Sequence, residues 1–69
     1  MERIPVSSSN IRAIGYDPDS LTLEIEFHSG PVYQYADVPE GEYDAMMAAD
    51  SKGTYLNAHI RGRYSCFKL

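Results

Sequence analysis

The chain has 69 residues, of which 43% are hydrophobic and 23% charged, and a net charge of −4, which indicates one small folded domain and excludes a disordered chain. Its single cysteine, Cys66, excludes an internal disulfide and a zinc site of paired cysteines, and it favours a reducing compartment. The sequence shows no secretory leader and no apolar segment of bilayer length, so we expect a cytoplasmic protein without membrane contact.

The first half of the chain predicts three antiparallel strands joined by tight turns. Residues 1–8 are expected to be a flexible lead-in, which leaves residues 9–69 as the folded domain. The clearest strand is 21–28, where Leu, Leu, Ile and Phe alternate with Thr, Glu, Glu and His, as in a half-buried antiparallel strand. The other strands are expected at residues 10–16 and 32–35, with turns at 17–20 and 29–31.

The second half predicts two helices. Pro39 and two early glutamates suit a helix N-terminus, and Tyr43, Met46 and Met47 then form one apolar stripe. Ser51 is a natural cap for a second helix, which ends at Gly62 and is followed by a short tail. The expected fold is therefore α+β: a three-stranded antiparallel meander followed by two helices packed on one face (β-β-β-α-α).

Tyr33 and Tyr35 share one face of the third strand, and the preceding loop decides which face this is. A loop with an even number of residues turns both tyrosines away from Phe27, where they could stack on unpaired bases. A loop with an odd number places them on the core face, and we favour this because a small domain without tryptophan needs aromatic side chains there. Pro31 cannot take a positive φ, so we expect an odd loop other than the common three-residue one that ends in a left-handed residue.

Charge is distributed unevenly along the chain. Ten acids and two arginines give residues 1–50 a charge of −8, whereas residues 51–69 carry four cations and no acid. Such asymmetry points either to an anionic partner at the basic end or to pairing of that end with the acidic part of the same chain. Within the basic part, Ser51 to Thr54 opens a helix and could present free N–H groups to an anion, with Arg61 and Arg63 at the far end of that helix.

Several short segments, taken together and in order, resemble the KTSC family, which takes its name from a C-terminal extension of some lysyl-tRNA synthetases. The matching pieces are Ser9-Asn10-Ile11, Ile14-Gly15-Tyr16-Asp17, Leu23-Glu24-Ile25-Glu26-Phe27, Gly30, Tyr33-Gln34-Tyr35, Val38-Pro39, Tyr43, Ala49-Asp50-Ser51-Lys52-Gly53, Tyr55-Leu56-Asn57, Ile60-Arg61 and Tyr64. The resemblance covers nearly the whole chain and implies the free-standing bacterial form, with a Tyr-x-Tyr signature matched by Tyr33 and Tyr35. It implies no catalytic residue and no cofactor, and it suggests RNA as a ligand. At Ser65 to Lys68 the chain departs from the aromatic and basic tail of its relatives.

We therefore expect a binding domain without catalytic activity, metal or cofactor, because no cluster of titratable residues and no phosphate loop is evident. The first hypothesis is weak RNA binding through six residues: Tyr33, Tyr35, Lys52, Asn57, Arg61 and Arg63. The alternative is a protein-interaction module or a homodimer with no nucleic-acid role, which would use a strand edge or the adjacent methionines Met46 and Met47.

Overall fold

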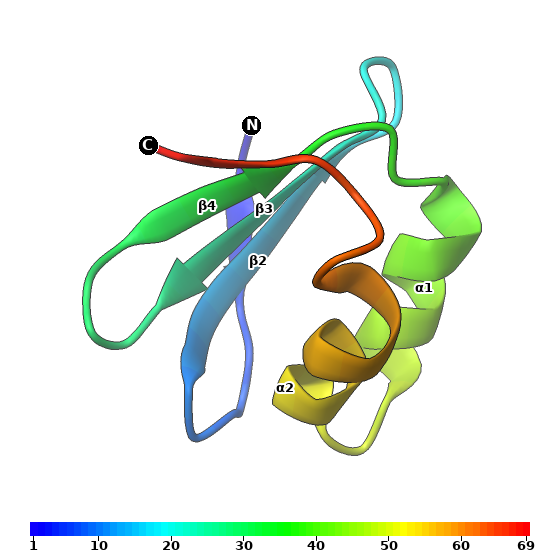
Figure 1. The fold of residues 1–69 in the computed structure, drawn as a ribbon. Helices are drawn as coiled ribbons and strands as arrows, with labels where there is room; N and C mark the ends of the chain where they lie inside the picture. Colours follow the sequence, from blue (N-terminus) through cyan, green and yellow to red (C-terminus); the bar gives the residue numbers. More distant parts are fainter.

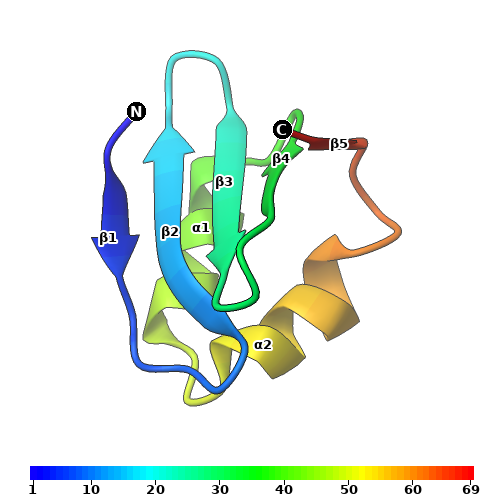
Figure 2. The same cartoon turned by 90° about the vertical axis from the view of Figure 1, so that its left-hand side faces the viewer.

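The computed structural model describes all 69 residues, and in it one antiparallel sheet is covered on one face by a helical layer (Figure 1). The sheet has the order β1-β2-β3-β4-β5 (Figure 2) and consists of β1 (Arg3–Pro5), β2 (Ile11–Asp17), β3 (Thr22–Phe27), β4 (Val32–Tyr35) and β5 (Cys66–Lys68). The helical layer comprises α1 (Glu40–Ala48), α2 (Lys52–Tyr55) and the π-helical turn η1 (Leu56–Ile60). The α+β class and the central meander agree with the sequence prediction.

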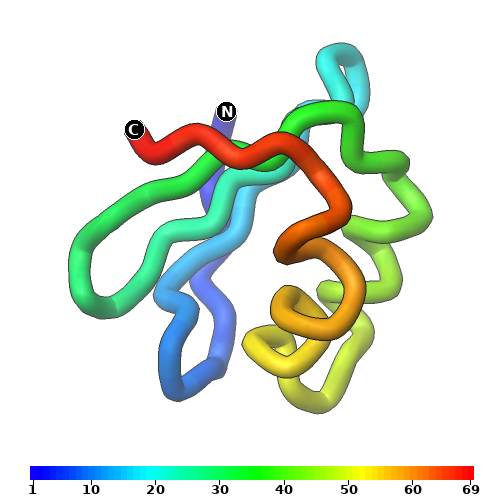
Figure 3. The backbone as a smooth tube through the Cα atoms, viewed as in Figure 1, coloured from blue at the N-terminus to red at the C-terminus, as the bar shows by residue number.

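The predicted number of strands was wrong, because the sheet has five strands rather than three. β1 lies in the segment predicted to be a flexible lead-in, and its Arg3 is opposite Gly15 of β2. β5 follows the helices and pairs with β4, so that Tyr35 is opposite Cys66. Figure 3 shows this last segment leaving the helical layer and crossing back to the edge of the sheet. Both added strands have three residues, which is too short for an alternating pattern to reveal them.

The loop between β3 and β4 places the two tyrosines on the core face, as favoured. Leu23 is opposite Tyr35 and Ile25 is opposite Tyr33, so the tyrosines face the helical layer. The three-residue form of the loop was not expected, because Pro31 cannot take a positive φ. Gly30, with φ 115°, is the residue of the loop that has the positive φ. Pro31 follows it and pairs with Phe27 through its carbonyl oxygen, which accepts from the N–H of Phe27 at 3.0 Å.

The core lies between the sheet and the helices. Its nine buried residues are Ile11, Ile14, Leu23, Ile25, Tyr35, Val38, Met46, Leu56 and Ile60. α1 contributes Met46 and lays Tyr43 on Tyr16 of β2, with ring centroids 4.8 Å apart and planes 9° from parallel. Met46 is fully buried and Met47 is half-buried against the core, so the two methionines do not together form the exposed surface considered for a protein partner. No helix is long and apolar enough to cross a membrane.

The outer face of the sheet carries a buried carboxylate that the sequence did not predict. Glu24 is only 7% exposed, although its place in the strand pattern predicted a solvated side chain. Arg3 donates to it at 2.6 Å and Gln34 at 2.7 Å, and these contacts tie β1 and β4 to β3. Burial favours the neutral acid, but the hydrogen bonds from Gln34 and Arg3 and the charge of Arg3 outweigh it, so the pKa of Glu24 is lowered.

Candidate nucleic-acid interface

The π-helical turn η1 gives the C-terminal half of the helical layer its shape. Ser51 caps α2 by accepting the N–H of Thr54 at 3.2 Å, and the helix then widens so that the N–H of Arg61 reaches the carbonyl of Leu56 at 2.8 Å. Leu56 and Ile60 are buried beneath the turn, whereas Asn57 and Arg61 are exposed. π-turns inside helices are rare and occur frequently at functional sites.

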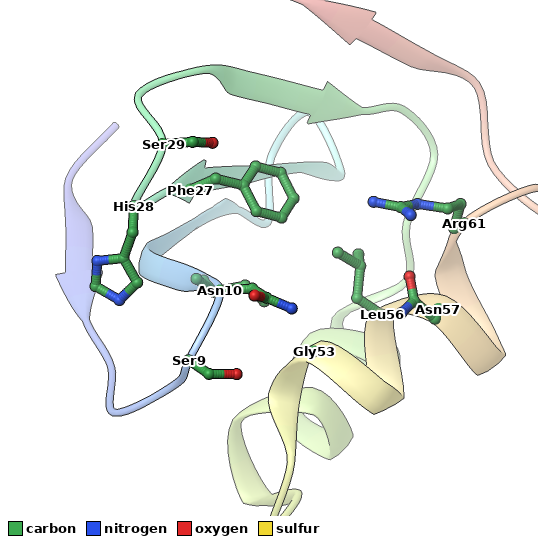
Figure 4. Close-up of a pocket in the computed structure, with 10 residues that line it drawn as sticks. Ser9, Asn10, Phe27, His28, Ser29, Gly53, Leu56, Asn57 and Arg61 are labelled. Atoms are coloured by element: carbon green, nitrogen blue, oxygen red, sulfur yellow. The ribbon is translucent and has the colours of Figure 1, made fainter.

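A depression of about 350 Å³, which we call the central hollow, lies between η1 and the open end of the sheet. It is lined by Ser9, Asn10, Ile11, Phe27, His28, Ser29, Gly53, Leu56, Asn57 and Arg61. Figure 4 shows Asn10 and Phe27 on the sheet side and Leu56, Asn57 and Arg61 on the helical side of one open space. The ring of His28 points away from this space, and its Nε2 lies 3.0 Å from the carbonyl oxygen of Ser8.

A second depression of about 240 Å³, the tyrosine hollow, is lined by Tyr33, Tyr35, Arg61, Gly62 and Cys66. Arg61 belongs to both hollows, so its guanidinium is the group that joins them. Burial is the main cause that raises the pKa of the Tyr35 hydroxyl, and the neighbouring Cys66 adds to this, whereas Arg61 acts in the opposite direction. The phenol of Tyr35 is therefore a neutral hydrogen-bonding group at the floor of this hollow.

A third depression of about 250 Å³, the serine hollow, has only polar or small residues in its wall and shares Asn10, Gly53 and Asn57 with the central hollow. Lys52 lines it and donates from Nζ to the carbonyl of Ala49 at 3.1 Å. Because the N–H of Thr54 is taken by the capping Ser51, that N–H is not free for an anion.

The structure brings five of the six predicted binding residues to these neighbouring hollows. Tyr33, Tyr35 and Arg61 meet in the tyrosine hollow, Asn57 and Arg61 in the central hollow, and Lys52 lies in the serine hollow. Arg63 lines none of them and lies instead near Glu42 of α1, whose pKa it helps to lower.

Sequence reasoning missed Asn10 and Phe27 as possible ligand contacts. The strand pattern predicted that Phe27 points into the core. Its ring does lie on that face but is only half-buried, and it packs edge-on against Tyr33, with ring centroids 5.8 Å apart and an interplanar angle of 78°. Asn10 lies in the chain entering β2, and nothing in a single sequence places that chain next to η1. The only signal was its occurrence in the Ser9-Asn10-Ile11 segment.

The charges around the central and tyrosine hollows are one-sided, whereas the serine hollow has both Asp50 and Lys52 in its wall. No Asp or Glu lines the central or the tyrosine hollow, although the chain has ten acidic residues. The ion pairs within 4 Å all belong to Arg3 and Arg12, on the outer face of the sheet. None of the four cations of residues 51–69 forms an ion pair within 4 Å of an acid, although Arg63 lies near enough to Glu42 to help lower the pKa of that acid.

Fold and site together define a small α+β domain: a meander sheet, a helical layer with a π-turn, and a depression beside Arg61 where the two meet. The KTSC domain model matches residues 7–64, and the chain belongs to the KTSC family. This confirms the resemblance found in the sequence. The function of the KTSC domain is not established.

Relatives occur both as free-standing proteins and within a longer enzyme. An uncharacterised protein of Stutzerimonas stutzeri is 44% identical over 57 residues, which is 83% of this chain and 80% of that protein. The crystal structure of a KTSC domain protein from Yersinia pestis has a TM-score of 0.93 and 48% identity, covering 99% of this chain and 96% of that one. A lysine–tRNA ligase of Nostoc is 39% identical over 61 residues, which is 88% of this chain but 11% of the ligase.

Proposed function

We propose that this chain is a non-catalytic, cytoplasmic domain that binds single-stranded RNA weakly through the surface around Arg61. The observation that carries the proposal is a guanidinium shared by two hollows, with no carboxylate in either wall. Arginine suits phosphate because its planar fork can donate two parallel hydrogen bonds. The chain is similar to part of a lysine–tRNA ligase, an enzyme whose name includes tRNA, and this similarity supports RNA as the source of that phosphate.

The shape of the surface supports single strands rather than duplexes. Sequence-tolerant binding of single strands combines cationic grooves with aromatic side chains on which bases stack. Phe27 and Tyr33 supply partly exposed rings beside Arg61, although Tyr35 is too deeply buried for a base to stack on its face. Lys52 and Asn57 extend the polar wall toward the serine hollow.

The test is a titration of the isotope-labelled chain with a short single-stranded RNA, followed through amide chemical shifts at low and near-physiological salt. We expect shifts around Arg61, Asn57 and Tyr33, with affinity that falls steeply as salt rises because phosphate contacts release counterions. Charge reversal in Arg61→Glu should abolish binding. The control Arg12→Glu reverses a charge on the outer face of the sheet and should bind as the unaltered chain does. An affinity that is independent of salt, or equal in both variants, contradicts the proposal.

A second candidate function is self-association through the β5 edge. Phe67 is 59% exposed and Leu69 is 65% exposed, and both lie on the outer face of the sheet, opposite Gln34 and Val32 of β4. β5 is hydrogen-bonded to β4 alone, so its other side offers unpaired backbone groups to a second copy of the chain.

Sedimentation velocity over a wide concentration range tests self-association. A dimer through β5 predicts a sedimentation coefficient that rises with concentration, and Phe67→Lys should return the protein to a monomer. A single monomeric species at millimolar concentration rules this candidate out and leaves the RNA proposal unaffected.

A further inference from the structure

Three polar side chains face the central hollow, and Arg61 among them also lies beside the hydroxyl of Tyr35. The carboxamides of Asn10 and Asn57 make no side-chain hydrogen bond within the chain, and Arg61 makes no ion pair. Figure 4 shows all three directed toward the same open space. A hollow in which a few polar groups converge beside apolar side chains is the default candidate for a ligand site.

The kinds of groups present restrict the ligand. A carboxamide offers both a donor and an acceptor, so a pair of them suits the edge of a planar molecule that itself carries donors and acceptors. A guanidinium suits a phosphate or a carboxylate. A simple anion can accept from the amide N–H groups but leaves the carboxamide oxygens unused, whereas a nucleotide carries a polar ring edge and a phosphate together.

The apolar part of the wall suits a flat ring. Phe27 and Leu56 border the space from opposite sides, and the edge-on contact with Tyr33 fixes the orientation of the Phe27 ring. Aromatic side chains stack readily on bases that have left a helix, and specific recognition of RNA uses such splayed-out bases. The volume of about 350 Å³ lies at the small end of ligand sites, which suits one nucleotide rather than a stretch of duplex.

We propose that the central hollow binds one unpaired nucleotide, with its base against Phe27, its base edge on Asn10 and Asn57, and its phosphate on Arg61. This inference rests on the proposed RNA function and narrows it to a single-nucleotide site. An RNA strand that continues from this nucleotide past Asn57 would reach the hydroxyl groups of the adjoining serine hollow.

The test compares the four ribonucleoside 5′-monophosphates, the matching nucleosides and inorganic phosphate in amide chemical-shift titrations of the full chain. We expect the monophosphates to shift Asn10, Gly53, Asn57 and Arg61, the nucleosides to do so at higher concentration, and inorganic phosphate to affect Arg61 alone. Asn57→Ala and Arg61→Gln should each weaken monophosphate binding about tenfold, the effect of losing one good hydrogen-bonding partner. Both positions are exposed, so the fold should survive, and the spectrum of each variant checks this.

Arg63→Gln is the matched control, because Arg63 is an exposed arginine two residues from Arg61 that lines no hollow. Its monophosphate affinity should equal that of the unaltered chain. Shift patterns that are the same for phosphate and monophosphate would overturn the nucleotide site, as would an absence of shifts at tens of millimolar ligand. If Asn57→Ala leaves RNA binding intact, the nucleotide site is wrong and the proposed RNA function stands. If the chain binds monophosphates but no RNA, the nucleotide site stands and the proposed RNA function is wrong.

Discussion

Leu56→Ala is expected to lower the free energy of unfolding by about 2–5 kcal/mol, the usual cost of cutting a fully buried leucine to alanine. Leu56 is 1% exposed and belongs to the core cluster, and it also starts the π-turn that carries Asn57 and Arg61. Domains have stabilities of about 0.05–0.15 kcal/mol per residue, which is roughly 3–10 kcal/mol for a chain of this length. One cavity could therefore leave a large fraction of the protein unfolded at room temperature.

Urea denaturation followed by circular dichroism measures the effect, and Leu69→Ala is the matched control. Leu69 is 65% exposed, so the same deletion there should change the free energy of unfolding by less than about 0.5 kcal/mol. If the two variants have equal midpoints, the packing of η1 on the sheet contributes little to stability. The assignment of Leu56 as the residue that anchors the π-turn would then be wrong.

The central part of the fold could be predicted from the sequence because its patterns are local. Alternation over residues 21–28 predicted β3, and the apolar stripe of Tyr43, Met46 and Met47 predicted the helix whose Met46 reaches the core. The edge strands could not be predicted, since three residues give no period. Their positions depend on distant partners: Arg3 contacts Glu24, and Cys66 pairs with Tyr35.

The candidate site shows a similar division. The residue types of Asn57 and Arg61 drew attention in the sequence, because the basic end of the chain carries no acid. Nothing local predicted the π-turn that presents them, and nothing local predicted that Asn10 would lie across the space from Asn57. Arg61 and Arg63 are the same residue type two positions apart, so the sequence could not distinguish them. The chain turns between them at Gly62, which has φ 84°, and only Arg61 faces the hollows.

Glu42 links the parts of the helical layer by hydrogen bonds, and its substitution is the second change that we expect to lower the free energy of unfolding substantially. The hydroxyl of Tyr55 donates to one of its carboxylate oxygens, and the hydroxyl of Tyr64 donates to the other at 3.0 Å. One side chain of α1 thereby holds both α2 and the segment that leads to β5. Glu42→Ala should lower the free energy of unfolding by about 1–2 kcal/mol, below the full value of two charge-assisted hydrogen bonds because Glu42 is partly exposed to solvent.

The dependence on pH distinguishes the charge of Glu42 from its shape. The hydrogen bond from Tyr55 is the main cause that lowers the pKa of Glu42, and Tyr64 and the charges of Arg63 and His59 add to it, whereas burial opposes it. Because the folded pKa lies below the unfolded value, the stabilisation is complete above about pH 4.5 and is lost as the pH falls through the folded pKa. Glu42→Gln keeps the shape and lacks this titration, so its deficit relative to the unaltered chain should shrink as the pH falls below 4.5. Glu40→Gln, on an exposed site in the first turn of the same helix, removes a carboxylate that accepts no hydrogen bond, so its effect on the free energy of unfolding should be smaller than that of Glu42→Gln at neutral pH. A deficit of Glu42→Gln that stays constant with pH would mean that the two tyrosines bind the oxygen atoms of Glu42 and gain nothing from its charge.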